Sequence, residues 1–226
     1  MSEKLCWIDT ETTGLSKDKN DIIQLAMLIE IDGEIKEKHN WTCKPFRTDT
    51  IHPRALAANG RTVVEMMGFE APEIIADRFL AELSKHVTED SPEKFLFAGW
   101  NTSFDIRFVK AWLLKCGNGA SESESDCPAV YNELFDYHNL DTMGTFRTFK
   151  KQKGIPLESN KLVDAAEFFE LKHGAHEALS DIEVTMKIQK LIDGTMTMDE
   201  ADKSVMATEI DNSDEREEAL GKSLDL

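Results

Sequence analysis

The sequence has few cysteines, no long apolar segment and a shortage of positive charge. Its four cysteines are scattered without a CxxC pair, so they suggest neither a structural zinc site nor a disulfide scaffold, and reduced thiols are expected. No apolar run approaches the roughly 18 residues that a membrane span requires, and the first residues do not form a signal peptide. A soluble, intracellular, cytoplasmic protein with no membrane partner is therefore expected.

Positive charge is scarce: 26 basic residues stand against 43 acidic ones, a net charge of −17 over 226 residues. This balance argues against a protein that coats nucleic acid through bulk electrostatics, but it leaves room for a small metal-assisted site. Residues 193–226 hold 11 acidic and 3 basic residues and contribute −8 of the total. We expect one globular domain over residues 1–192 and an acidic tail over residues 193–226, disordered or partner-binding.

The pattern of apolar residues indicates an α/β protein. Strands are predicted at 5–8, 22–31, 34–43 and 95–100, with a short strand or loop near 139–141. Helices are predicted from Pro53 and Pro72, from about residue 104, and over 143–153, 162–171 and 178–192. The polar run at 117–126 reads as a flexible surface insertion. A strand that leads into a helix is the repeating unit of an α/β fold.

The first candidate for chemistry lies at the end of the first predicted strand. Asp9 and Glu11 are two residues apart there, and strand residues at this spacing point to the same side. The Asp-x-Glu spacing recurs at Asp32/Glu34 and at Asp181/Glu183 in this acidic chain, but Asp9 and Glu11 both lie at the end of an apolar run. Two converging carboxylates without a basic neighbour repel each other unless a cation lies between them. The pair is therefore a candidate for binding a divalent metal.

A second motif follows the fourth predicted strand, where Asn101, Phe104 and Asp105 begin an amphipathic helix. A purely structural alternative makes Asn101 a helix cap and Asp105 a partner of the helix dipole. The segment from Asn132 to Asp136 also repeats the same spacing. Asp105 is preferred because a strand-to-helix connection would bring it near the end of the first strand.

The third motif combines a histidine with a carboxylate. Of the six histidines, only His176 has an aspartate, Asp181, five residues later. A surface histidine and a helix-dipole aspartate are the structural alternative. A histidine on a loop and an aspartate one turn into the next helix can nevertheless reach one point, as a base and a metal ligand.

Together the three motifs resemble those of the DnaQ-like, DEDDh-type 3′-5′ exonucleases. The matching segments are WIDTETTGL with Asp9 and Glu11, GWNTSFD with Asp105, and HEALSD with His176 and Asp181. Their order and separations match the family over about residues 5–192. The resemblance implies an α/β, ribonuclease H-like fold with a central mixed five-stranded sheet flanked by helices. The last motif lacks the tyrosine of the sister DEDDy group.

The resemblance also implies roles for individual residues. Two divalent ions, Mg²⁺ or Mn²⁺, would be held by Asp9, Glu11, Asp105 and Asp181. His176 would take the proton from the attacking water, and 5′-mononucleotides would leave the 3′ end. The residues expected to contact the terminal nucleotide are Thr12, Leu15, Asn101 and Phe104.

Three functional hypotheses follow. The first is an exonuclease that acts on the 3′ end of single-stranded or frayed DNA, as in polymerase proofreading. The second is an exoribonuclease of the same superfamily, because nothing in these motifs reads the 2′-hydroxyl. The third is a catalytically silent scaffold or polymerase-interaction protein. We favour DNA over RNA, and the acidic tail is a candidate for docking a DNA polymerase or a sliding clamp.

Overall fold

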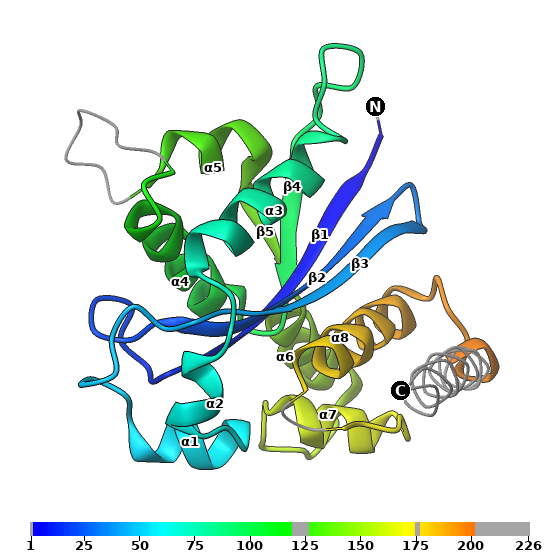
Figure 1. The fold of residues 1–226 in the computed structure, drawn as a ribbon. Coiled ribbons are helices and arrows are strands. Elements are labelled where there is room, and N and C mark those ends of the chain that lie inside the picture. The colour runs from blue at the N-terminus through cyan, green and yellow to red at the C-terminus, as the bar shows by residue number, and fades with distance from the viewer. Residues whose placement is uncertain (1, 119–126, 175–176, 202–226) are drawn as a thin grey trace, which may run out of the picture.

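One mixed sheet forms the centre of the computed structural model, which describes residues 2–118, 127–174 and 177–201 (Figure 1). The strands are β1 (Lys4–Thr12), β2 (Ile22–Ile31), β3 (Glu34–Thr42), β4 (Phe95–Gly99) and β5 (Phe135–Asp141). Their order in the sheet is β3-β2-β1-β4-β5. β1 pairs antiparallel with β2 and parallel with β4, so the predicted mixed five-stranded sheet is confirmed.

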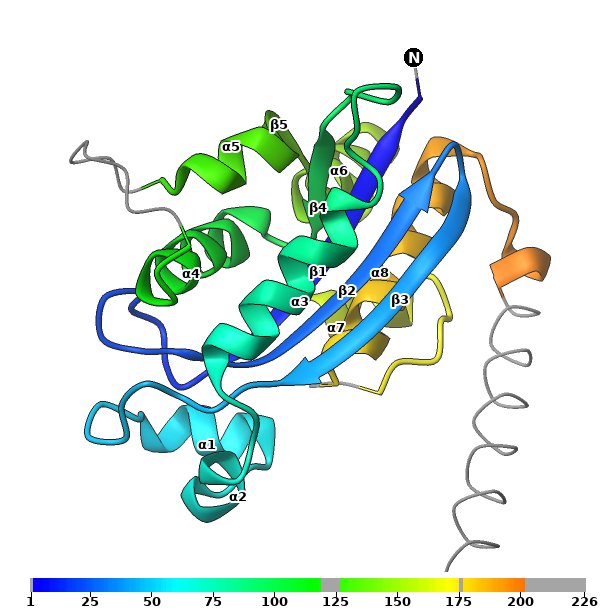
Figure 2. The ribbon, with the colours of Figure 1, turned by 45° about the horizontal axis from the view of Figure 1, so that its top comes forward.

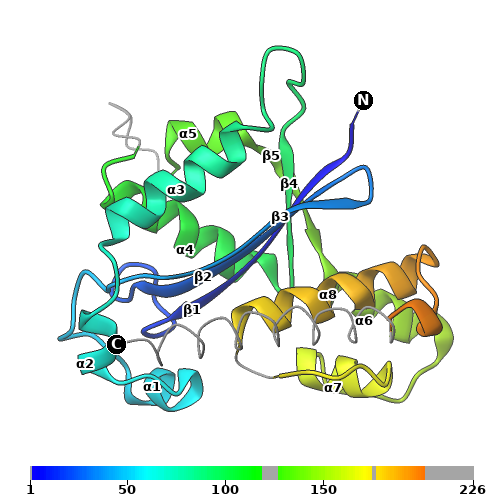
Figure 3. The same cartoon turned by 45° about the vertical axis from the view of Figure 1, so that its right-hand side comes forward.

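Helices cover both faces of the sheet. They are α1 (Pro53–Asn59), α2 (Val63–Met67), α3 (Pro72–Ser84), α4 (Thr102–Lys115), α5 (Ala129–Leu134), α6 (Thr142–Lys153), α7 (Leu162–Phe168) and α8 (Ala178–Asp193). Figures 1 and 3 show α3, α4 and α5 on one face and α6, α7 and α8 on the other. Figure 2 shows α1 and α2 beside the ends of β2 and β3. No helix among the described residues has the length and apolar character that crossing a bilayer would require.

The alternation of side chains along β1 explains why the sheet has two apolar faces. Cys6 and Ile8 pack in the same core cluster as the apolar residues of α3 and α4. Trp7, between them, packs in a second cluster with Ala178 and Ile182 of α8. Successive strand residues point to opposite faces, so a fully apolar run places one core on each side of β1.

Two short helices and the start of β5 are not predicted by the sequence pattern. α2 and α5 have 5 and 6 residues, too few turns to show a helical apolar period. α2 instead begins with a capping box between Thr62 and Glu65. β5 begins at Phe135, four residues before the predicted strand, because Phe135 is buried and stacks on Tyr131.

The chain continues beyond α8 for several described residues. Met196 and Ala201 pack with apolar residues of α6, α7 and α8. The rest of the predicted tail, residues 202–226, and most of the predicted insertion, residues 119–126, lie outside the described residues. The proposed boundary at residue 192 stays a prediction.

A close backbone approach fixes the start of α4 against β1. A Cβ atom at Gly99, the last residue of β4, would lie 2.8 Å from the carbonyl oxygen of Ile8. Only glycine leaves room for that carbonyl, so β4 and the helix that follows it lie close to the end of β1.

Phe79 provides a test of the core between α3 and the sheet. Its ring is fully buried and lies 6.0 Å from the ring of Trp112 and 6.4 Å from that of Phe135. We expect Phe79→Ala to lower the free energy of unfolding by about 3–5 kcal/mol, because it leaves a cavity among these rings. Val64→Ala is the control, since Val64 is 85% exposed and should change stability by less than about 0.5 kcal/mol. Urea unfolding of both variants measures the difference, and similar values for the two would contradict this view of the core.

Candidate active site

Three carboxylates meet where β1 approaches the first turn of α8. Asp9 and Glu11 follow Trp7 at alternate positions of β1, on the face that packs against α8. Asp181 lies in the first turn of that helix. One carboxylate oxygen from each of the three residues lies within 4.8 Å of the other two. All three side chains are half-buried, so the group could hold one metal ion between a strand and a helix.

Asp105 reaches β1 from the opposite layer. It lies in the first turn of α4 and is 3% exposed. Its Oδ1 accepts hydrogen bonds from the backbone nitrogen of Thr10 at 3.1 Å and from the Thr10 hydroxyl at 2.7 Å. Asp105 is not part of the three-carboxylate group, but its charge is close enough to raise the pKa of Asp9.

The segment that repeats the spacing of the second motif lies elsewhere. Asn132 belongs to α5 and Asp136 to β5. The Asp136 carboxylate is 35% exposed and accepts hydrogen bonds from the backbone and ring nitrogens of His138. These hydrogen bonds lower the pKa of Asp136, which is the opposite of the change at Asp105. Asp136 therefore has the environment of a surface carboxylate.

Burial and mutual repulsion dominate the electrostatics of the site. Desolvation, followed by the charges of Asp105, Asp181 and Glu11, raises the pKa of Asp9 well above its usual range. Desolvation and the charges of Asp181 and Asp105 raise the pKa of Glu11 to about 7. Desolvation also raises the pKa of Asp105 to about 7, against the hydrogen bonds from Thr10. Groups that resist ionisation together in this way accept a divalent cation readily, because the cation removes the repulsion.

Histidine enters the site from a position that the motif analysis did not select. His173 Nε2 lies 2.5 Å from Asp181 Oδ1, and the His173 side chain is 7% exposed. His176, the predicted base, lies outside the described residues. His173 precedes Asp181 by eight residues in a segment without regular structure, so its contact with Asp181 depends on how that segment folds back.

The predicted substrate contacts fall into two groups. Leu15 is 85% exposed, and Asn101 is exposed with a left-handed backbone (φ 61°). The Asn101 side chain does not cap the backbone of α4 but accepts a hydrogen bond from the Ser103 hydroxyl at 3.3 Å. Thr12, in contrast, is buried and donates its hydroxyl hydrogen bond to the carbonyl of Gly14. Phe104 is half-buried against Phe108.

Two residues near α1 approach the same site from outside the three motifs. Asn59 Nδ2 donates a hydrogen bond of 3.0 Å to the carbonyl of Thr12, which ties α1 to the end of β1. Arg61 opposes the effects of burial and neighbouring carboxylates on the pKa of Glu11, so its positive charge lies near the cluster. No local pattern distinguishes Arg61 from other surface arginines, because its position depends on the long connection between β3 and α3.

Comparisons with known proteins agree with this arrangement. The sequence model of the RNase T exonuclease family matches residues 6–189. The DNA polymerase III PolC-type proteins of Thermotoga petrophila and Thermotoga maritima are both 24% identical to the chain over 181 residues. These matches cover 80% of this chain but only 11% of each relative.

Among solved structures, E. coli exonuclease I in complex with a dT13 oligonucleotide has a TM-score of 0.66 at 18% identity, over 84% of this chain and 41% of that chain. The zinc-bound form of the E. coli exonuclease I complex with single-stranded DNA has a TM-score of 0.68 at 18% identity, over 87% and 41%. At this identity the likeness shows the shared fold. Because the family match spans most of the chain, the chain belongs to the DnaQ-like exonuclease family and has the ribonuclease H-like fold.

Proposed function

We propose that the chain is a metal-dependent 3′-5′ exonuclease that releases 5′-mononucleotides from single-stranded or frayed DNA. The observation that carries the proposal is the meeting of Asp9, Glu11 and Asp181, with Asp105 behind them, in a member of an exonuclease family. DNA is favoured because exonuclease I was solved with a DNA oligonucleotide and the curated relatives are DNA polymerases. The PolC relatives also support proofreading as the biological role, with a DNA polymerase as partner.

The residues at the site fit divalent metal ions. Oxygen ligands suit Mg²⁺ or Mn²⁺, and the raised pKa values of Asp9 and Glu11 reflect a negative charge that a cation would neutralise. Asp9, Glu11 and Asp181 would hold one ion, and Asp9 and Asp105 would hold a second. Two bound ions would supply an activated water and stabilise the leaving oxygen.

The remaining residues would bind the substrate and move one proton. In this proposal His176 takes the proton from the attacking water, and His173 holds the Asp181 carboxylate in place. Leu15 and Asn101 are exposed beside the site and contact the terminal nucleotide.

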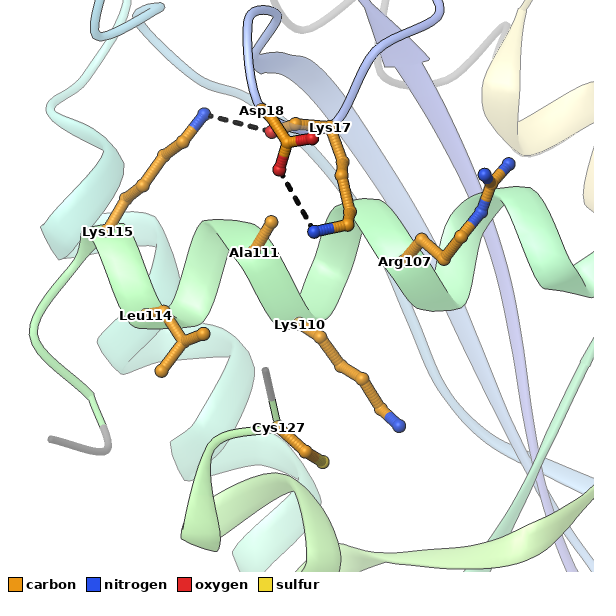
Figure 4. Close-up of a pocket in the computed structure, with 8 residues that line it drawn as sticks. All are labelled: Lys17, Asp18, Arg107, Lys110, Ala111, Leu114, Lys115 and Cys127. Atoms are coloured by element: carbon orange, nitrogen blue, oxygen red, sulfur yellow. Dashed lines mark hydrogen bonds and ion pairs between the residues drawn. The ribbon is translucent and has the colours of Figure 1, made fainter. Parts of the chain in front are cut away.

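A basic cleft along α4 provides a path for the rest of the strand. Figure 4 shows the cleft, about 620 Å³ in volume, between α4 and the loop after β1. Its positive residues are Lys17, Arg107, Lys110 and Lys115. Lys115 is bound to the Asp21 carboxylate at 2.7 Å, Arg107 donates a hydrogen bond to the carbonyl of Ser103 at 2.8 Å, and the Lys110 ammonium lies 4.5 Å from the centre of the Tyr131 ring. Figure 4 shows Arg107 and Lys110 leaving α4 in different directions along the cleft. Arg107 follows Asp105 by two residues, so the cleft reaches the end of α4 that carries Asp105, on the other side of the helix. We therefore propose that phosphates of the DNA backbone bind in this cleft.

The class of reaction can be tested with labelled substrates. In Mg²⁺ or Mn²⁺, 5′-labelled single-stranded DNA should give a ladder that shortens from the 3′ end, and a matched RNA should be cut more slowly. Asp9→Asn should lower the rate by about 100-fold or more, because even outer-shell partners of a metal contribute about 10- to 100-fold. Asp136→Asn, at the surface carboxylate, should retain the wild-type rate. Faster cutting of RNA would favour an exoribonuclease, and no cutting with any substrate would favour a silent scaffold.

The raised pKa values also predict how stability depends on pH. Between about pH 4 and pH 7 the folded chain holds more protons on Glu11 and Asp105 than the unfolded chain, so the free energy of unfolding should fall as pH rises. In EDTA, Glu11 and Asp105 should therefore make the melting temperature lower at about pH 8 than at about pH 6. Mg²⁺ should raise the melting temperature more at about pH 8 than at about pH 6, because at pH 8 protons no longer compete with the ion for the carboxylates.

A single substitution isolates this contribution from the rest of the chain. Asp9→Asn should raise the melting temperature in EDTA at about pH 8, since it removes one of the repelling charges. Asp136→Asn is the matched control and should give no such gain, because the pKa of Asp136 is lowered by the fold. Equal melting temperatures for the wild type and Asp9→Asn in EDTA would show that repulsion at the site does not lower the stability of the folded chain.

The proposed path of the strand predicts a change in salt dependence. Replacing Arg107 and Lys110 with alanine should weaken binding of a single-stranded oligonucleotide, and it should reduce the log–log slope of affinity against salt by about 1.4 for two lost phosphate contacts. Cleavage of a dinucleotide, too short to enter the cleft, should be unchanged. Lys36→Ala, on the β2–β3 hairpin, is the control. An unchanged slope in the double variant would place the strand elsewhere.

A further inference from the structure

A second group of metal-ligating side chains lies on the other face of the sheet. Glu37 and His39 are two residues apart on the edge strand β3, so their side chains share one face. Glu82 and His86 are four residues apart at the end of α3, one on the helix and one on the turn that follows it. This i, i+4 spacing places two side chains on one side of a helical turn.

The cluster is separate from the active-site carboxylates. His39 pairs with Met27 across the sheet, and Met27 packs in the core beneath α3. Asp9 and Glu11 follow Trp7 on the face that packs against α8. The two groups are therefore on opposite faces of the sheet, and the reaction proposed above makes no use of the second.

Glu37, His39 and Glu82 each offer a ligand atom, and these three atoms all lie within 4.8 Å of one another, while His86 lies beside the group, against Glu37. His39 Nε2 lies 3.6 Å from Glu37 Oε2 and 3.6 Å from Glu82 Oε2. His86 Nε2 lies 3.9 Å from Glu37 Oε1. Four ligands at about 2.0–2.1 Å from a tetrahedral Zn²⁺ are separated from one another by about 3.3 Å. The observed distances are too long for hydrogen bonds and are only slightly longer than this separation.

The two imidazoles are held in place, yet the ring nitrogens that face the carboxylates lack hydrogen bonds. Nε2 of His39 and Nε2 of His86 are both buried and have no hydrogen-bond partner. The His39 ring stacks on Trp41 with 4.6 Å between centroids, and the His86 ring meets Phe95 edge-on at 6.3 Å. Buried polar atoms without a partner are unfavourable, and a metal ion would satisfy both at once.

We propose that Glu37, His39 and Glu82 form a structural zinc site that links β3 to the end of α3, and that His86, beside Glu37, moves in as the fourth ligand when the ion binds. Two imidazole nitrogens and two carboxylate oxygens suit Zn²⁺ better than Mg²⁺, which prefers oxygen ligands alone. Four protein ligands leave no open position for a substrate, so the ion has a structural role.

Solvent can reach the proposed site, and the ion pair that competes with a metal there is at the surface. The four side chains are 19% to 31% exposed, so an ion can enter without unfolding. Lys85 forms an ion pair with Glu82, but the Lys85 side chain is 54% exposed and can turn into solvent when a cation binds.

Zinc content after equilibrium dialysis tests the proposal. The full chain is dialysed against buffered Zn²⁺ with excess Mg²⁺, and zinc per chain is measured by atomic absorption. We expect the His39→Gln/His86→Gln variant to bind one zinc fewer than the wild type. His138→Gln, which alters a histidine paired with Asp136 elsewhere on the sheet, should bind as the wild type does. Equal zinc content in the wild type and the double variant would overturn the proposal.

Two further measurements separate this site from the carboxylates of the proposed active site. Asp9→Asn should keep the zinc that the histidine variant loses, and loss in Asp9→Asn alone would assign the ion to the active site. The His39→Gln/His86→Gln variant should retain nuclease activity in Mg²⁺, and this activity would show that the variant is folded.

If the double variant does not fold, Glu37→Gln preserves both histidine rings and provides a second test. It should weaken zinc binding by about 10-fold or more in competition with a chromophoric chelator. Unchanged affinity would again overturn the proposal.

Discussion

The repulsion among carboxylates at the junction of β1, α4 and α8 is the constraint on which the rest of the structure depends. The pKa of Asp9 is raised strongly, because burial and three neighbouring acids all oppose its ionisation. Such an arrangement persists only if the surrounding fold holds the groups together more strongly than they repel. The apolar contacts of Trp7 with α8 and the hydrogen bonds from Thr10 to Asp105 provide that restraint.

The two faces of β1 hold different parts of the carboxylate group. Trp7, Asp9 and Glu11 face α8, while Thr10 faces α4 and fixes Asp105. β1 lies in the middle of the sheet with partners on both edges, so its backbone has little freedom to relax the repulsion. The close approach of Gly99 to Ile8 then sets where α4 begins. A central strand with two different faces thus positions acids from three separate segments of the chain.

Sequence patterns predicted the parts of this arrangement that depend on local chemistry. The apolar run before Asp9 and the apolar periods of α3, α4 and α8 follow directly from what each element must bury. Asp105 could be preferred over Asp136 only by assuming that a strand-to-helix connection returns to the sheet edge. Contacts made by segments without regular structure were not predictable in this way. The pairing of His173 with Asp181 and the nearness of Arg61 to Glu11 are of this kind.

The zinc proposal illustrates the same limit. Cysteine spacing gave no sign of a metal, and the two halves of the cluster are about 45 positions apart in the sequence, so only the packing of α3 on β3 brings them together.

The attachment of α1 and α2 has an evolutionary consequence. α1 buries none of its side chains and α2 buries only Met66, yet Asn59 binds the end of β1 and Arg61 lies near Glu11. This segment therefore borders the reacting centre while contributing little to the apolar interior. Mutations can accumulate in it at small thermodynamic penalty, whereas the proposed function requires the acids that meet at β1. Substrate choice can diversify among descendants of such a chain while the hydrolytic chemistry stays fixed.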